Sequence, residues 1–241
     1  MRDSERRTRW RCLIPVAALL LWTAAASAGS YSVKPVIVNL SDQRPATTLR
    51  VTNTHSQPVN LQVAAFAWSQ HHGEDRLVET QAIIAMPPVF TLPPGKTQSL
   101  RVGLRNARPG DVERAFRLVL KEIPPADQGG GLQLALNMSL PVFVKPSAAV
   151  GPELHWQLRR GAAGELALRV ENRGAAHGKF SEWQLQRQGE TLASEAGLFY
   201  LLPGSSREWP LAASPALARG DRVDVVVLGS GRPARTQTTV R

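Results

Sequence analysis

Cysteine is almost absent from this chain, and the residues that build common catalytic centres are scattered. The single cysteine, Cys12, stands near the N-terminus, which excludes Cys-ligated zinc, iron–sulfur clusters and thiol nucleophiles from everything that follows. None of the five histidines stands in a His-Glu-x-x-His pattern, and no Gly-x-Ser-x-Gly elbow occurs. The sequence therefore predicts a protein that is not an enzyme, with no catalytic residues, no cofactor and no metal site.

Acidic residues are in the minority, but the excess of positive charge has no pattern. The chain carries 29 Lys and Arg against 19 Asp and Glu, a formal net charge of +10. The basic residues are spread along the chain, and no aromatic-rich RNA-binding motif accompanies them. We therefore expect a solvated basic surface and no nucleic-acid partner.

Apart from the N-terminus, the chain has no long apolar run. Arginines at positions 2 to 11 precede an apolar stretch from Leu13 to Ala26, and Ala26-Ser27-Ala28 offers a small-x-small cleavage site. This order predicts a secretory signal peptide at residues 1–28. The stretch is shorter than the about 20 residues of a comfortable membrane span, so a retained anchor is the lesser alternative. We expect an exported protein with no membrane insertion after signal cleavage.

Helical periodicity is nearly absent, and alternation of apolar and polar residues takes its place. Turn-forming clusters rich in Pro, Gly, Ser and Asp separate the alternating segments. Seven short strands of this kind predict an immunoglobulin-like sandwich. A change of phase between Val63 and Phe66 predicts a bulge or a sheet switch near Ala64-Ala65. The seven predicted strands are Val33–Leu40, Thr47–Thr54, Val59–Trp68, Ala82–Met86, Thr97–Leu104, Ala115–Ile123 and Leu132–Val144.

A break at Pro146 and the small residues after it predicts a domain boundary. We assign residues 29–146 to an N-terminal domain and residues 147–241 to a smaller C-terminal β-sandwich domain. Alternation resumes in the second half, although Pro210, Pro215 and Pro233 interrupt it. Its predicted strand segments lie at Leu154–Leu158, Leu166–Val170, Trp183–Leu185, Gly197–Leu202, Arg222–Leu228 and Ala234–Val240.

The last predicted strand of the first domain is unusual because a large apolar residue occupies every second position. In an extended strand these side chains share one face. An ordinary core strand has the same pattern, so the alternation alone leaves both interpretations open. The residues on this face are Leu132, Leu134, Leu136, Met138 and Leu140.

The segments around this strand occur in a specific order. Pro87-Pro88-Val89-Phe90-Thr91-Leu92-Pro93-Pro94-Gly95 comes first, Glu122-Ile123-Pro124-Pro125 follows, and Phe143-Val144-Lys145-Pro146 closes the strand. With these segments, residues 33–146 closely resemble the periplasmic pilus and fimbrial chaperones of the chaperone–usher pathway. The second half resembles them more weakly, mainly through Phe199-Tyr200-Leu201-Leu202-Pro203-Gly204.

This resemblance implies a fold, a location and a mechanism. The fold is all-β, with two immunoglobulin-like β-sandwich domains in an L- or boomerang-like arrangement, and the location is the periplasm. The mechanism is donor-strand complementation, in which the chaperone lends its last first-domain strand to a pilus subunit and delivers the subunit to an outer-membrane usher. The lent face would be the alternating row from Leu132 to Leu140. Uncovered, such a strand is prone to aggregation, so self-association of the free protein or a covering loop is expected.

The chain departs from the family pattern at the anchor for the subunit's terminal carboxylate. Well-studied members use an Arg in the first strand and a Lys in the lent strand, whereas this chain has apolar residues near Val36–Ile37 and Pro141. In this departure the chain resembles the archaic branch of the chaperone family, whose clients are spore-coat-like fimbrial subunits. A carboxylate needs a cation, so Arg117 is the first anchor candidate, followed by Lys121 and Lys145.

Lys145 has a second expected role. With Glu113 it matches positions that form a salt bridge across the domain junction in relatives, and such a bridge would orient the two domains. Two other classes of function stay open from the sequence. One is an exported immunoglobulin-like adhesin or fimbrial subunit, and the other is a carbohydrate-binding protein or enzyme on the same scaffold.

Overall fold

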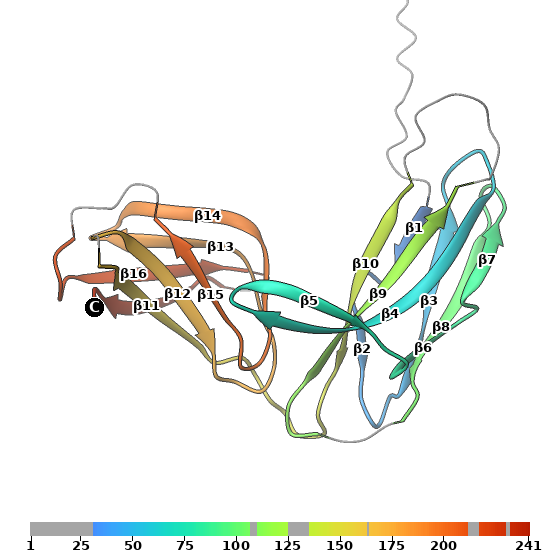
Figure 1. Ribbon diagram of the computed structural model, residues 1–241, viewed down its shortest axis with the longest axis horizontal. Helices are drawn as coiled ribbons and strands as arrows, with labels where there is room; N and C mark the ends of the chain where they lie inside the picture. Colours follow the sequence, from blue (N-terminus) through green and yellow to red (C-terminus); the bar gives the residue numbers. More distant parts are fainter. Residues whose placement is uncertain (1–30, 107–109, 125–134, 163, 212–216, 230–231) are drawn as a thin grey trace, which may run out of the picture.

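The computed structural model describes residues 31–241 except 107–109, 125–134, 163, 212–216 and 230–231. These described residues form 17 strands and no helix, so none of them lies in a helix long and apolar enough to cross a membrane. The strands gather into two bodies that meet at an angle (Figure 1). The predicted all-β fold of two sandwich domains in a boomerang arrangement is confirmed. The predicted signal peptide lies outside the described residues.

The described residues of the first domain form ten strands in two sheets. One sheet has the order β1-β3-β8-β6, and the other has the order β2-β10-β9-β4-β5, with β7 also paired to β4. Only the pairing of β2 with β10 is parallel. The strands are β1 (Tyr31–Lys34), β2 (Val38–Leu40), β3 (Ala46–Asn53), β4 (Val59–His71), β5 (Glu74–Glu79), β6 (Ile83–Met86), β7 (Val89–Leu92), β8 (Thr97–Leu104), β9 (Arg114–Ile123) and β10 (Asn137–Val144).

In the second domain the residues that the structure describes form seven strands, also in two sheets. Their orders are β11-β12-β15 and β14-β13-β16-β17. The connection from the first domain runs between the end of β10 and the start of β11, and it contains the predicted boundary after Pro146. The strands are β11 (Leu154–Arg160), β12 (Leu166–Asn172), β13 (Gly178–Arg187), β14 (Glu190–Leu201), β15 (Ser206–Pro210), β16 (Arg222–Leu228) and β17 (Ala234–Thr239).

Alternation in the sequence becomes the inside and outside of each sandwich. In β12, for example, Leu166, Leu168 and Val170 are fully buried, and the residues between them are partly exposed. Each domain has its own cluster of buried apolar side chains. Because the two clusters are separate, each domain buries a core of its own, and a third, smaller cluster forms where the domains meet.

The first predicted strand is two strands in the structure. Pro35 lies in the gap between β1, which pairs with β3, and β2, which pairs with β10 in the other sheet. Proline has no N–H to donate to a ladder, so the chain leaves one sheet there and joins the other. The prediction of a single strand from Val33 to Leu40 is therefore wrong in this detail.

The change of phase in β4 is neither a bulge nor a sheet switch. Pairing with β9 continues without a shift from Asn60 to Ala67. What changes is the neighbour on the opposite edge, which is β7 for the first residues of β4 and β5 for the last. Trp68 points away from the first-domain core, and it is buried because the second domain covers it.

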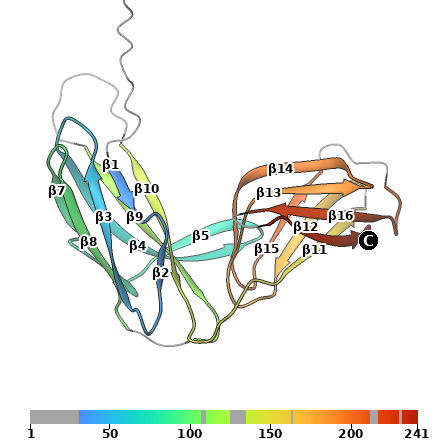
Figure 2. The same ribbon diagram turned by 180° about the vertical axis from the view of Figure 1, so that it is seen from behind.

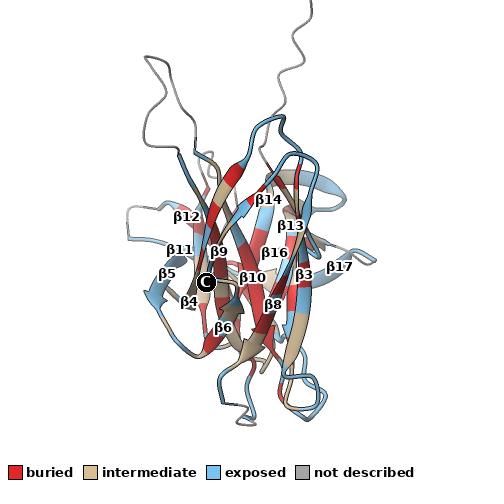
Figure 3. Ribbon diagram, turned by 90° about the vertical axis from the view of Figure 1, so that its right-hand side faces the viewer, coloured by how far each residue is buried: buried red, intermediate tan, exposed pale blue. Residues whose placement is uncertain are grey.

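Three strands were missed by sequence reasoning. β5 is exposed along its whole length and carries no apolar alternation (Figure 3). β7 is short and lies between two Pro-Pro pairs, and β15 ends in Pro210. Each of them forms because a neighbouring strand supplies the hydrogen-bonding partners, which local pattern does not reveal.

Tyr31 in β1 connects the start of the first domain to β9 and to the segment just before β10. Its hydroxyl donates a hydrogen bond to the carbonyl oxygen of Leu120 at 2.8 Å, and the carbonyl oxygen of Leu136 lies 3.3 Å from the same hydroxyl as a second acceptor. Burial raises the pKa of Tyr31 to about 12. Because the folded-state pKa lies above the ordinary value, the neutral tyrosine stabilises the fold below about pH 10, and this contribution is lost as the pH rises toward about 12.

Spectroscopic titration of tyrosinate absorbance tests this placement. The chain has two tyrosines, Tyr31 and Tyr200, and we expect one of them to ionise late, together with a loss of stability above about pH 10. Tyr31→Phe should remove the late transition and cost about 1 kcal/mol of unfolding free energy. Ionisation of both tyrosines near pH 10 in the folded wild-type protein would contradict the buried position.

Candidate functional site

The first half of β10 has an open edge. β10 pairs with β9 from Asn137 to Val144, but it pairs with β2 only from Val142 onward. Among the described residues, no strand lies beside Asn137–Pro141 on the side away from β9. The backbone N–H and C=O groups along this edge are therefore available to another strand.

The apolar row that leads into β10 differs in burial along its length. Leu136 and Met138 are only partly buried, and they pack against the rim of the first-domain core. Leu140 is 3% exposed and belongs to the core itself, so the prediction that it contacts a subunit is corrected. It lies next to Val142, where β2 joins the sheet and closes the edge. Leu132 and Leu134 lie outside the described residues, and their role stays a prediction.

Arg117 lies on the opposite face of the same sheet. It stands in register between Phe66 of β4 and Pro141 of β10. Its guanidinium carbon is 3.7 Å from the centroid of the Trp68 ring, and Nη2 donates a hydrogen bond to Asp75 Oδ2 at 3.5 Å. The structure therefore brings Arg117 next to Pro141, where the family pattern has the anchoring lysine of the lent strand.

The burial of Arg117 sets its electrostatics. The side chain is 16% exposed. Burial lowers the pKa of Arg117, and the nearby Asp75 carboxylate partly offsets this effect. An arginine in a protein keeps its charge in any case, so the site presents a positive, half-buried group with one carboxylate beside it.

The other two anchor candidates are more exposed. Lys121 also lies on β9, with its Nζ 5.9 Å from the centroid of Phe66. Lys145 follows the end of β10 and lines two surface hollows of about 520 and 420 Å³. Neither makes an ion pair within the described part of the chain. The structure does not gather the three candidates into one site.

Aromatic side chains join the two domains. Trp68 and Phe143 of the first domain pack against Tyr200 and Leu202 of the second. Trp68 meets Tyr200 edge to face at 5.6 Å between centroids. The His177 ring stacks on Phe143 at 3.6 Å, with the planes 8° apart. Sequence reasoning missed this cluster, although the phase change in β4 was a signal of it.

Glu113 pairs across the junction with His177, and this corrects the predicted Glu113–Lys145 salt bridge. Glu113 is 5% exposed. Its Oε1 lies 2.6 Å from His177 Nδ1 and accepts a hydrogen bond from the His177 backbone N–H at 3.1 Å. Lys145 lines the same hollow as this pair but remains exposed. Stacking on Phe143 holds the imidazole against the carboxylate, and no comparable packing holds the lysine.

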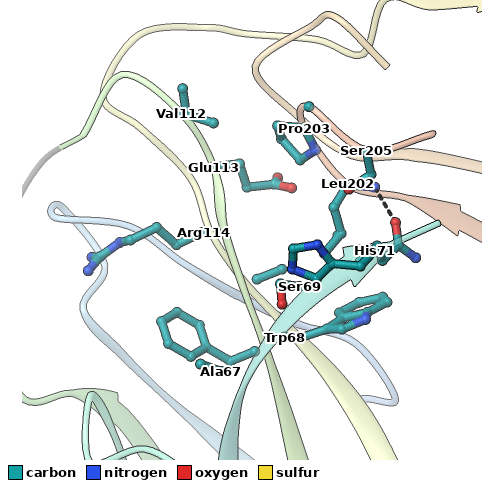
Figure 4. Close-up of a pocket in the computed structure, with 14 residues that line it drawn as sticks. Ala67, Trp68, Ser69, His71, Val112, Glu113, Arg114, Leu202, Pro203 and Ser205 are labelled. Atoms are coloured by element: carbon teal, nitrogen blue, oxygen red, sulfur yellow. Dashed lines mark hydrogen bonds between the residues drawn. The ribbon is translucent and has the colours of Figure 1, made fainter. Parts of the chain in front are cut away.

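Gln70 adds a polar clamp beside the aromatic cluster. Its Nε2 donates to the carbonyl oxygen of Tyr200 at 3.0 Å, and its Oε1 accepts from the backbone N–H of Leu202 at 2.9 Å. The dashed line in Figure 4 marks the second of these bonds. The Gln70 side chain at the end of β4 thus forms hydrogen bonds with two backbone groups of the second domain. No motif in the sequence indicated this contact.

A cavity of about 440 Å³ lies at the junction, between the end of β4, the start of β9 and the loop after β14 (Figure 4). Glu113 and Leu202 border it from opposite domains. Within the described residues there is no group of three or more His, Cys, Asp or Glu placed to hold a metal ion. The contacts that the structure describes across the junction are apolar packing and hydrogen bonds.

The chain is similar to known proteins in both sequence and fold. Residues 30–149 match the family model described as pili and flagellar-assembly chaperone, PapD N-terminal domain. The chain belongs to this chaperone family. The family consists of assembly chaperones, a class that acts by binding and not by catalysis.

Curated relatives of this chaperone family share about three in ten residues with the chain. Chaperone protein PapD of Escherichia coli is 28% identical over 149 residues, which cover 60% of this chain and 61% of PapD. Chaperone protein FimB/FhaD of Bordetella pertussis is 31% identical over 161 residues, covering 61% of this chain and 64% of that protein. The chain therefore matches less than two thirds of the length of these relatives.

A solved structure extends the likeness of fold to both domains. A chain of the CsuC–CsuE complex, a chaperone with a tip adhesion subunit from archaic chaperone–usher pili of Acinetobacter baumannii, matches with a TM-score of 0.68. The match covers 88% of this chain and 100% of that chain, at 21% identity. Since the covered part includes both sandwiches, the two-domain architecture is common to this chaperone fold.

Unfolding experiments can distinguish the partner of Glu113. His177→Ala should destabilise the protein by about 1–3 kcal/mol, because it leaves a buried carboxylate without its ring partner. Lys145→Ala removes the partner expected from the family and should change stability by less than about 0.5 kcal/mol. Urea denaturation of both variants provides the measurement. A larger loss for Lys145→Ala than for His177→Ala would restore the Glu113–Lys145 bridge.

Proposed function

We propose that this protein is a periplasmic chaperone that binds pilus subunits by donor-strand complementation and delivers them to an outer-membrane usher. The observation that carries the proposal is the open edge of β10, where the described residues place no strand beside Asn137–Pro141 on the side away from β9. The proposed signal peptide at residues 1–28 would direct the chain to the periplasm.

The proposed mechanism follows from strand geometry. A subunit strand that pairs along Asn137–Pro141 would gain main-chain hydrogen bonds there, and the alternate side chains of the chaperone would enter the subunit's groove. Leu136 and Met138 are partly buried against the first-domain core, and Leu132 and Leu134 continue the same alternation in the sequence. Burial of each such side chain contributes about 1.5–3 kcal/mol before the costs of association.

Arg117 is the anchor that we propose for the terminal carboxylate of the subunit. It is cross-strand to Pro141, and it is the least exposed of the three candidates. A guanidinium has five N–H donors, and Arg117 makes a hydrogen bond to one protein acceptor within the described residues. The guanidinium therefore has enough donors to bind the carboxylate of a subunit in bidentate fashion.

We also propose that the chain belongs to the archaic branch of the family, whose clients are spore-coat-like fimbrial subunits. Two features support this assignment. Val36–Ile37 and Pro141 replace the cationic anchor pair of the well-studied members, and the matching CsuC–CsuE complex comes from an archaic chaperone–usher system.

Co-expression of the tagged mature protein with fimbrial subunits in the periplasm tests the proposal. We expect a stable 1:1 complex that releases subunits into fibres when the usher is added. Recovery of the tagged protein alone, with subunits equally abundant in its absence, would favour an adhesin or a carbohydrate-binding protein instead.

Leu134→Arg tests the lent strand. The charged side chain would face the apolar groove of the subunit, so the variant should fold normally and fail to capture subunits in the co-expression assay. Leu198→Arg serves as a matched control, because Leu198 is 65% exposed in the second domain and its replacement should leave capture intact. Capture by Leu134→Arg at the wild-type level would mean that another segment is lent.

Arg117→Gln tests the anchor. Loss of a charge-assisted contact to a carboxylate should weaken subunit binding by about 10-fold to 150-fold. Lys121→Gln and Lys145→Gln remove the same charge from the other two candidates and should change the affinity by less than about threefold. Urea denaturation of each variant separates loss of binding from loss of fold. An equal or larger effect at either lysine would relocate the anchor.

A further inference from the structure

The hairpin of β4 and β5 brings an acid to the proposed anchor. It extends from the first domain toward the second, as Figures 1 and 2 show from opposite sides. The tip of the hairpin lies close to the second domain. A β-carbon added at Gly73 would be only 3.2 Å from Cγ of Arg207 in β15. β5 is exposed throughout, so its side chains add nothing to either core. Asp75 nevertheless points its carboxylate at Arg117, 42 residues further along the chain.

The Asp75 carboxylate is held from two sides. Its Oδ1 accepts a hydrogen bond from Gln70 Nε2 at 2.9 Å, and its Oδ2 accepts from Arg117 at 3.5 Å. The register of the hairpin places Asp75 directly opposite Gln70. The carboxylate therefore connects the proposed anchor to the side chain that clamps the second domain.

The ion pair between Asp75 and Arg117 is weak enough for another carboxylate to replace Asp75. Good charge-assisted hydrogen bonds between a guanidinium and a carboxylate measure about 2.7–2.9 Å, so a distance of 3.5 Å describes a loose pair. The Asp75 side chain is 44% exposed, and ion pairs with such access to water are weak because water competes for both charges. Arg117, by contrast, is held over the Trp68 ring.

We propose that Asp75 is a positioning residue that stands in for the subunit's terminal carboxylate. This inference rests on the proposed function of Arg117. In the free chaperone, Asp75 supplies the counter-charge for the half-buried guanidinium and keeps it over Trp68. When a subunit arrives, its carboxylate takes the place of Asp75 at Arg117, and Asp75 turns into solvent.

The exchange leaves the domain junction closed. Gln70 has two N–H groups, one directed to Asp75 and the other to the carbonyl oxygen of Tyr200. A carboxylate only accepts hydrogen bonds, so the Gln70 amide must face Asp75 with its Nε2 donor and not with its Oε1 acceptor. Once Asp75 leaves, the contacts of Gln70 to Tyr200 and Leu202 remain, and the second domain keeps its position.

Acetate titration of the mature chain tests the inference with the smallest carboxylate probe. The NMR signal of the Arg117 side-chain N–H reports binding, and sodium chloride keeps the ionic strength constant. Asp75→Asn preserves the size of the side chain and removes the competing charge, so we expect it to bind acetate about two- to fivefold more tightly than the wild type. A purely structural role for Asp75 would give weaker binding, not tighter.

Glu79→Gln is the matched control. Glu79 is an exposed acid at the end of the same strand, and its replacement removes the same charge without touching Arg117. We expect this variant to bind acetate as the wild type does. Equal affinities for Asp75→Asn and Glu79→Gln, or weaker binding by Asp75→Asn, would overturn the stand-in role while leaving Arg117 as the anchor. If acetate shifted the Arg117 signal in no variant, both the anchor and the stand-in role would fall, and the lent strand would still be tested by Leu134→Arg.

Discussion

The ladder between β9 and β10 is the interaction on which the rest of this structure depends. β10 is paired along its whole length with β9, whereas on its other side the part of the chain that the structure describes pairs with it only where β2 joins. The same strand is therefore a core strand at one end and an open edge at the other. A strand in this situation keeps its register through β9 while its free backbone groups remain available. This one-sided support lets a folded domain offer a strand without unfolding.

Successive side chains of a strand point in opposite directions. The sheet that contains β9 and β10 therefore packs against the first-domain core with one face and presents different residues on the other. On the inner face, Leu118 and Leu120 fill the core beside the apolar row of β10. On the outer face, Phe143 packs against the second domain and Arg117 lies over Trp68. The proposed strand donor and the proposed carboxylate anchor thus occupy adjacent strands, and the domain junction lies at the end of the same sheet. The angle between the domains is consequently part of the site's geometry.

The junction shows how a family architecture can be kept while its contacts change. Relatives are expected to join the domains through a salt bridge at the positions of Glu113 and Lys145, whereas here Glu113 pairs with His177, which stacks on Phe143. The proposed anchor would follow the same rule, since an apolar residue stands at Pro141 and the cation Arg117 stands across from it on β9. At the junction the partner of Glu113 comes from a spatial neighbour of the family position, so the charge is balanced although the sequence motif is lost.

The sequence by itself determined the all-β class, the two domains and the apolar row of β10, because alternation and turn residues are local properties that a strand carries wherever it is placed. It also suggested Arg117 as a candidate anchor, because a carboxylate needs a cation, and that role stays a proposal. Only the tertiary structure decided that Leu140 belongs to the core, since burial depends on where β2 closes the edge. The pairing of Glu113 with His177, 64 residues apart, and the burial of Trp68 on an outward face depend on how the second domain packs against the first. Packing between distant segments leaves no periodic trace in the chain, and for that reason these features could not be predicted.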